Sequence, residues 1–198
     1  NLAMLFVFSA FSFFSYGVNG LRNGVACSFV IWAMSLYPEG VKHKIFASCL
    51  CFVGFFIHKS IVLPIVCFLV SYYIIKKFQW ALAFWFISII LSLALGNTVA
   101  SFLEPFLGFD QRFSEYLSAG SDMDVMQGFS HTGFRWDFLL YSSMPIILGY
   151  YVLQKRKIKD RIYTILLNTY IGANAFWIIV INASFSNRFA YLSWFCIL

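Results

Sequence analysis

The chain alternates between long apolar stretches and short polar connections, and this alternation predicts a series of helices. The apolar stretches cover residues 2–18, 24–37, 45–57, 61–75, 80–103, 137–153, 162–183 and 190–198. A helix that crosses a bilayer needs about 20 residues, a length that two of these stretches reach easily. We therefore predict an all-α fold, a polytopic transmembrane bundle of about seven to eight spanning helices. We expect residues 1–198 to form one transmembrane domain, cut from a longer polytopic protein.

The composition excludes most classes of soluble protein. Of the 198 residues, 61% are hydrophobic and only 11% are charged, whereas a typical soluble domain is about 25% charged. A soluble fold cannot hide so much apolar surface and keep its exterior polar. This excludes a soluble enzyme, a nucleic-acid-binding module and a disulfide scaffold. The expected surroundings are a lipid bilayer, with no nucleic acid as partner.

The basic residues predict how the helices are oriented. If stretches 45–57 and 61–75 are two helices joined by a tight turn, nine of the fourteen Lys and Arg residues share one side: Lys42, Lys44, Lys76, Lys77, Lys155, Arg156, Lys157, Lys159 and Arg161. A single fused helix would destroy this asymmetry, so the positive-inside rule favours the hairpin. The connections expected in the cytoplasm are then 38–44, 76–79 and 154–161.

The longest connection, residues 104–136, is expected on the outer (periplasmic) side. Within it, Phe109, Phe113, Tyr116 and Leu117 recur at helical spacing between charged residues. This pattern predicts a short amphipathic helix that lies in the membrane interface. Long loops of this kind often carry function.

The few cations on the predicted outer side each lie at or near a helix end, apart from Arg112 in the loop helix. They are Arg22, Lys59, Arg112, Arg135 and Arg188. Because a guanidinium matches the geometry of phosphate oxygens, arginines at converging helix ends would suit a lipid-linked pyrophosphate. The alternative is that each arginine simply extends to the interface.

Two further residues could take part in chemistry on this side. His58 ends a short apolar stretch and could act as a general base at neutral pH, or simply donate a hydrogen bond at a helix end. Asp137 lies close enough to Arg135 to hold it in place. The sequence has no metal-ligand spacing and no nucleotide-binding motif, so we expect no metal and no cofactor.

Four segments together resemble the EpsG-like branch of the Wzy-type O-antigen (polysaccharide) polymerases. They are NGLRNGVA (19–26), GFFIHKSIVLPI (54–65), GFRWDFLLYSSMPIILGYY (133–151) and SNRFAYLSW (186–194). In this resemblance Arg22 matches an Arg that precedes a Gln in the family, where this chain has Asn23. His58 matches the "FH-S" element, Arg135 and Asp137 match "FRWD", and Arg188 matches the Arg after the seventh helix.

The resemblance implies a membrane glycosyltransferase at the outer face of the bacterial inner membrane. Such an enzyme moves an oligosaccharide from its undecaprenyl-pyrophosphate carrier onto another lipid-linked repeat unit, as in lipopolysaccharide biosynthesis, with a chain-length regulator protein as a possible partner. Arg22, Arg135 and Arg188 would hold the pyrophosphate, and His58 or Asp137 would be the base. Trp136 could stack on a sugar ring, and the scheme requires no metal.

Two other functions stay open at this stage. A flippase or other transporter of lipid-linked oligosaccharides would also need arginines for the pyrophosphate, but charged residues near the bilayer midplane are typical of transporters. A membrane acyltransferase would need a base on the cytoplasmic side, where His43 is the one histidine. The gathering of charges at one rim favours a fixed enzymatic site.

Overall fold

The computed structural model describes residues 20–95, 98, 134–182 and 187–196, with the side chains of residues 187 and 188 excepted. These residues form seven α-helices and no strand, which confirms the helical fold class. The helices are α3 (Leu21–Leu36), α4 (Val41–Ile57), α5 (Val62–Tyr73), α6 (Phe78–Leu95), α10 (Trp136–Tyr150), α11 (Arg161–Ile179) and α12 (Asn187–Trp194). The predicted helix at 2–18 and the predicted loop helix at 109–117 lie outside the described residues.

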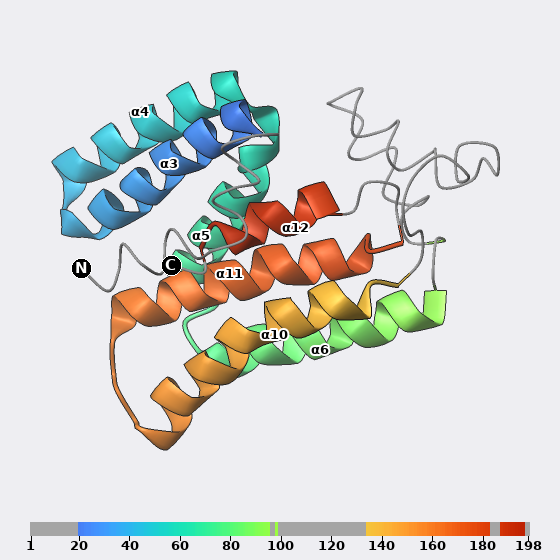
Figure 1. Ribbon diagram of the computed structural model, residues 1–198. Helices are drawn as coiled ribbons and strands as arrows, with labels where there is room; N and C mark the ends of the chain where they lie inside the picture. The colour runs from blue at the N-terminus through green and yellow to red at the C-terminus, as the bar shows by residue number, and fades with distance from the viewer. Residues whose placement is uncertain (1–19, 96–97, 99–133, 183–186, 197–198) are drawn as a thin grey trace, which may run out of the picture.

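Short irregular turns separate the helices. A 3₁₀ turn, Tyr37–Glu39, follows α3 and is closed by Gly40, whose φ of 141° is a conformation that side-chain-bearing residues rarely adopt. A second 3₁₀ turn, Lys59–Ile61, separates α4 from α5, and the backbone of His58 before it is extended. The chain therefore forms two helices here, as predicted, but they diverge from the turn instead of packing side by side as a tight hairpin (Figure 1). A π-helical turn, Tyr151–Lys155, extends α10.

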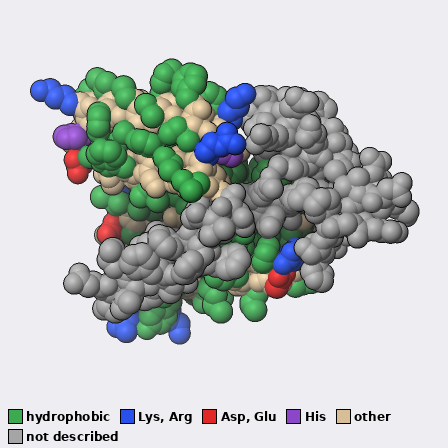
Figure 2. Space-filling model, turned by 45° about the horizontal axis from the view of Figure 1, so that its top comes forward, with side chains coloured by type: hydrophobic (Ala, Val, Ile, Leu, Met, Phe, Trp, Pro, Cys, Tyr) green, Lys and Arg blue, Asp and Glu red, His purple; other side chains and the backbone are tan. Residues whose placement is uncertain are grey.

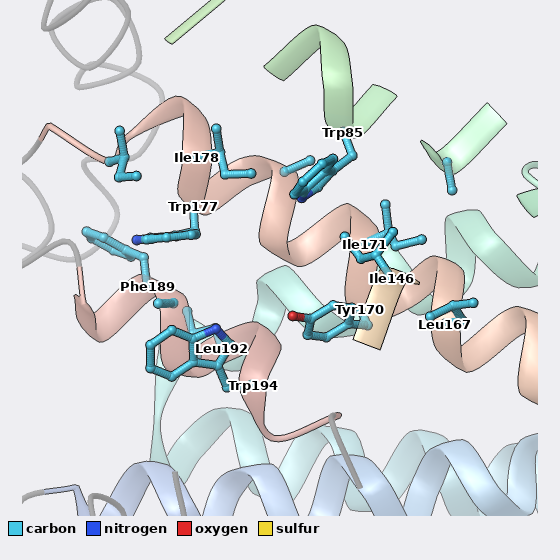
Figure 3. Close-up of a cluster of buried hydrophobic side chains, with 14 of the residues drawn as sticks. Trp85, Ile146, Leu167, Tyr170, Ile171, Trp177, Ile178, Phe189, Leu192 and Trp194 are labelled. Atoms are coloured by element: carbon cyan, nitrogen blue, oxygen red, sulfur yellow. The ribbon is translucent and has the colours of Figure 1, made fainter. Parts of the chain in front are cut away.

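Helix α11 lies at the centre of the bundle. Figure 1 shows it between α12 on one side and α6 with α10 on the other, while α3 and α4 form a separate hairpin above. Asp160 begins α11 by accepting a hydrogen bond from the backbone N–H of Tyr163 at 3.0 Å. Most of α11 is buried, and it supplies Tyr170, Ile171 and Trp177 to the main hydrophobic core (Figure 3).

Close approach between α3 and α4 depends on a small residue. A Cβ atom at Gly54 would lie 2.8 Å from Ile61 Cδ1 and 3.3 Å from the backbone oxygen of Ala26. Small residues are typical of such contacts between membrane helices. Because the two helices form an antiparallel hairpin, Gly54 opposite Ala26 brings His58, one turn later in α4, to the level of Arg22 in α3.

The outside of the bundle is strongly apolar. Large hydrophobic side chains are exposed along α6, where Trp80 is 68% and Ile90 67% accessible, and along α4 and α10. Figure 2 shows such side chains over much of the described surface. Two helices, α6 and α11, are long and apolar enough to cross a bilayer, judged on length and composition. A surface of this kind fits a lipid environment rather than water.

Candidate functional site

The best-defined polar group of the described residues is an ion pair at the start of α10. Arg135 is the residue before the helix, and Asp137 lies in its first turn. Arg135 donates from Nε to Asp137 Oδ1 at 2.9 Å and from Nη2 to Oδ2 at 2.6 Å. This two-bond arrangement fixes the plane of the guanidinium as well as its position. The predicted proximity of these two residues is therefore present in the structure.

An aromatic ring also packs against the flat face of the Arg135 guanidinium. Its central carbon lies 3.9 Å from the centre of the Phe138 ring, a cation–π contact. Phe138 in turn packs edge-on against Trp194 of α12, with ring centres 5.1 Å apart. The side chain of Arg135 is only 24% exposed, although it carries a full charge. A carboxylate in its plane and a packed ring on its face therefore preorganise this cation.

The pairing shifts both groups toward their charged forms. The hydrogen bonds that Arg135 donates to Asp137 raise the pKa of Arg135. In the same way, the hydrogen bonds from Arg135 lower the pKa of Asp137 to about 2, at the exposed start of α10. A carboxylate with both oxygens engaged and a lowered pKa is a weak base. The geometry thus favours Asp137 as the residue that positions Arg135.

Trp136, the predicted sugar-stacking residue, points away from the core. Its side chain is 62% exposed, and its ring lies 4.5 Å from that of Phe134. An exposed indole braced by a second ring offers an apolar platform beside the charge of Arg135. Sugar rings present C–H faces that pack on such platforms.

His58 and Arg22 form a second group, at the end of the α3–α4 hairpin. His58 ends α4, and its backbone N–H donates to Gly54 O at 2.9 Å. Its side chain is half-buried, with Nδ1 shielded from solvent. Arg22 is exposed in the first turn of α3. The structure therefore places a shielded imidazole and an exposed cation at the same level of neighbouring helices.

The structure brings these groups to one side of the bundle but does not join them. In Figure 1, α3, α10 and α12 each run from right to left and α4 runs from left to right, so the starts of the first three and the end of α4 point to the same side. Arg188 is the second residue of α12, and its side chain lies outside the described part. The contacts of Arg135 among the described residues are with α10 and α12 and include neither Arg22 nor His58.

Comparison with known proteins assigns the chain to a family. The model of the EpsG family matches residues 1–198, the whole of the sequence. The chain belongs to the EpsG family. This family includes Wzy-like, polymerase-type proteins, so membership indicates a membrane protein with a glycosyltransferase-like or polymerase role. No curated protein and no solved structure matches the chain.

Behind Arg135, a buried hydrogen-bond network ties the helices of this EpsG-family protein together. Trp194 Nε1 donates to Ser142 Oγ at 2.8 Å, and Tyr170 Oη donates to the backbone oxygen of Ser142 at 2.7 Å. Trp85 Nε1 donates to Asn174 Oδ1 at 2.8 Å, linking α6 to α11. These bonds join α6 and α10 to α11, and α12 to α10. They fix the aromatic layer on which Arg135 rests.

Ser142→Ala is expected to destabilise the protein by about 1 kcal/mol, because the indole N–H of Trp194 loses this acceptor in the core. Ser143→Ala is the matched control, since Ser143 is half-buried and its hydroxyl donates to Leu140 O of the same helix, with no bond to another described helix. The measurement is thermal unfolding of the purified full-length protein in detergent. Equal unfolding temperatures for the two variants would contradict the role of the network.

Sequence reasoning missed the residues that support Arg135. Phe138 follows Arg135 by three residues, a spacing that puts both on one helical face, and this was the one available signal. Trp194 and Tyr191 lie more than fifty residues further along, and nothing in their local sequence links them to α10. Only the packing of α12 against α11 brings them near.

Proposed function

We propose that this protein polymerises lipid-linked oligosaccharide repeat units into a surface polysaccharide such as O-antigen. The substrate is an oligosaccharide on an undecaprenyl-pyrophosphate carrier, and the reaction takes place at the outer face of the bacterial cytoplasmic membrane. Family membership supports the reaction class. The observation that supports a pyrophosphate-linked substrate is the preorganised Arg135 at a helix end, which is paired with Asp137 and stacked on Phe138.

The chemistry requires a cation where charge develops. The bond between the anomeric carbon of the donor sugar and the pyrophosphate oxygen breaks, and the pyrophosphate leaves on its lipid with both electrons of that bond. Asp137 occupies Nε and one N–H of Nη2, so the N–H groups of Nη1 stay available to the leaving oxygens. A donor fixed before the reaction needs no reorganisation during it. In this scheme Arg22 and Arg188 add further positive charge.

The acceptor must lose a proton as the new bond forms. A hydroxyl of the acceptor sugar attacks the anomeric carbon, and its proton passes to a base. We assign this role to His58, because Asp137 is engaged with Arg135 and has a lowered pKa. Trp136 would hold a sugar ring beside the cation by stacking. The scheme needs the α3–α4 hairpin and the start of α10 to face one substrate.

The proposed reaction fits the topology expected from the sequence. In that topology the connections 38–44, 76–79 and 154–161 lie in the cytoplasm and the connection 104–136 lies outside. The positive-inside asymmetry supports it. It puts Arg22, His58 and Arg135 together on the outer side, where the exported repeat unit is found. The enzyme and its proposed substrate would then share one leaflet.

The test is a surface-polysaccharide gel of cells in which the parent gene is deleted and then restored. We expect deletion to remove the ladder of long chains while a single repeat unit still reaches the surface, and restoration to bring the ladder back. Loss of the single unit as well would overturn the proposal in favour of a flippase. An unchanged ladder would exclude both functions.

A further inference from the structure

A cavity of about 220 Å³ lies between α3, α4 and α5, far along the chain from Arg135 and Asp137. Apolar side chains from the three helices line it, among them Met34, Cys51 and Phe68. Figure 1 shows α4 and α5 diverging from the turn that joins them. The residues that line the cavity come from both of these helices and from α3, and we call this space the wedge. Ser48 and Leu69 at its edge are exposed. The wedge therefore opens sideways, toward the lipid that surrounds a membrane protein.

Two cations and three tyrosines gather at one end of this wedge. Tyr37, which lines the cavity, pairs its hydroxyl with that of Tyr73 at 2.8 Å. Lys44 Nζ lies 5.3 Å from the centre of the Tyr37 ring and 5.4 Å from that of Tyr72. The guanidinium of Arg161 lies 5.4 Å from the same Tyr72 ring. One aromatic ring therefore positions two positive charges from different helices.

Neither of these two charges forms an ion pair with a carboxylate within the described part of the chain. The ion pairs found there are His43 with Glu39 and Arg135 with Asp137. Asp160, next to Arg161, is used as the cap of α11. The hydrogen bond between Tyr37 and Tyr73, followed by burial, raises the pKa of Tyr37 to about 12, so this phenol stays neutral and adds no negative charge. The cluster therefore holds two positive charges that make no ion pair with a carboxylate of the described residues.

We propose that the wedge binds an anionic phospholipid. One acyl chain enters the apolar cavity through its open side, and the phosphate lies against Lys44 and Arg161. Charge complementarity selects the head group, since an apolar cavity alone would accept the chain of any phospholipid. The cluster also falls among the connections rich in Lys and Arg, which the proposed topology puts at the cytoplasmic leaflet, where anionic lipids concentrate. This inference is independent of the polymerase reaction.

The test is native mass spectrometry of the purified full-length protein in a mild detergent. The protein is titrated with phosphatidylglycerol, with phosphatidylcholine of the same acyl chains, and with inorganic phosphate. We expect phosphatidylglycerol to bind with an apparent affinity at least about fivefold above that of phosphatidylcholine. Lys44→Gln and Arg161→Gln should each remove most of that preference, while Lys77→Gln, in the turn before α6, should keep it.

Ser48→Phe provides a second test that leaves both cations in place. A ring at this exposed edge should block the wedge and weaken the binding of both phospholipids equally. Equal binding of the two lipids to the unaltered protein would overturn the proposal, as would a Lys77→Gln effect as large as that of Lys44→Gln. Displacement of bound lipid by millimolar inorganic phosphate alone would also overturn it, because the site would then recognise phosphate without an acyl chain.

Discussion

Cells that carry Arg135→Ala are expected to lose the polysaccharide ladder while the protein itself stays at its normal level in the membrane. The substitution removes the cation fixed by Asp137 and Phe138, the best-ordered donor available to a leaving pyrophosphate. Loss of one such preorganised donor typically lowers a rate by about 100- to 1,000-fold. Residual polymer should therefore fall below detection on a gel. The readout is ladder intensity relative to immunodetected protein.

Arg156→Ala is the matched control for this prediction. Arg156 also lies over an aromatic ring, that of Tyr151 at 5.5 Å, and donates to its hydroxyl at 3.1 Å. It follows the opposite end of the α10 segment and should be dispensable. Arg135→Lys should recover only part of the activity, because an ammonium cannot form the two-bond contact with Asp137. A full ladder from Arg135→Ala would remove this residue from the site.

Asp137→Asn separates two roles for the carboxylate. If Asp137 positions Arg135, the amide keeps one acceptor oxygen, and we expect a partial loss of activity with Arg135 still partly held. If Asp137 were the base, Asp137→Asn would be as severe as Arg135→Ala. Comparing the two variants in one gel therefore distinguishes positioning from proton transfer.

His58→Gln is expected to be the second variant that abolishes polymerisation. A general base contributes about 100- to 10,000-fold to a rate, and glutamine keeps the polarity and approximate size of the side chain without accepting the proton. The extended backbone at the end of α4 tolerates glutamine, so the fold should be preserved. The measurement is again ladder intensity, normalised to protein level.

His43→Gln gives the comparison within the same helix. His43 lies near the start of α4, half exposed and 3.6 Å from Glu39, at the opposite end of the α3–α4 hairpin. We expect it to leave the ladder intact. Equal activity of the His58 and His43 variants would contradict the assignment of the base and would leave the proposed role of Arg135 untouched.

The helices were predictable because the bilayer imposes a simple rule on sequence. Apolar stretches such as 24–37 and 45–57 reappear as α3 and α4, with ends shifted by a few residues. The break after Ile57 was predictable only from charge, because two apolar stretches separated by His58–Ser60 read almost as one helix. Confining most of the basic residues to one side required a turn there.

The geometry of the site was predictable only where its residues are neighbours in sequence. Arg135 and Asp137 are two positions apart, so a pair was expected, but the ring beneath the guanidinium was not. The contact of Phe138 with Trp194 depends on how α10, α11 and α12 pack, which no local pattern encodes. Joint binding of the pyrophosphate by Arg22, Arg135 and Arg188 stays a prediction, since it depends on how separate helices are arranged relative to one another.

Reconstitution in liposomes distinguishes polymerisation from transport of the intact lipid-linked unit. Purified full-length protein in liposomes is supplied with the undecaprenyl-pyrophosphate-linked repeat unit in the same leaflet as the proposed site, and both polymer length and released undecaprenyl pyrophosphate are measured. We expect a ladder of chains, with one carrier released for each new linkage and neither product from the Arg135→Ala protein. Movement of the intact lipid-linked unit across the bilayer, with no new linkage formed, would contradict it.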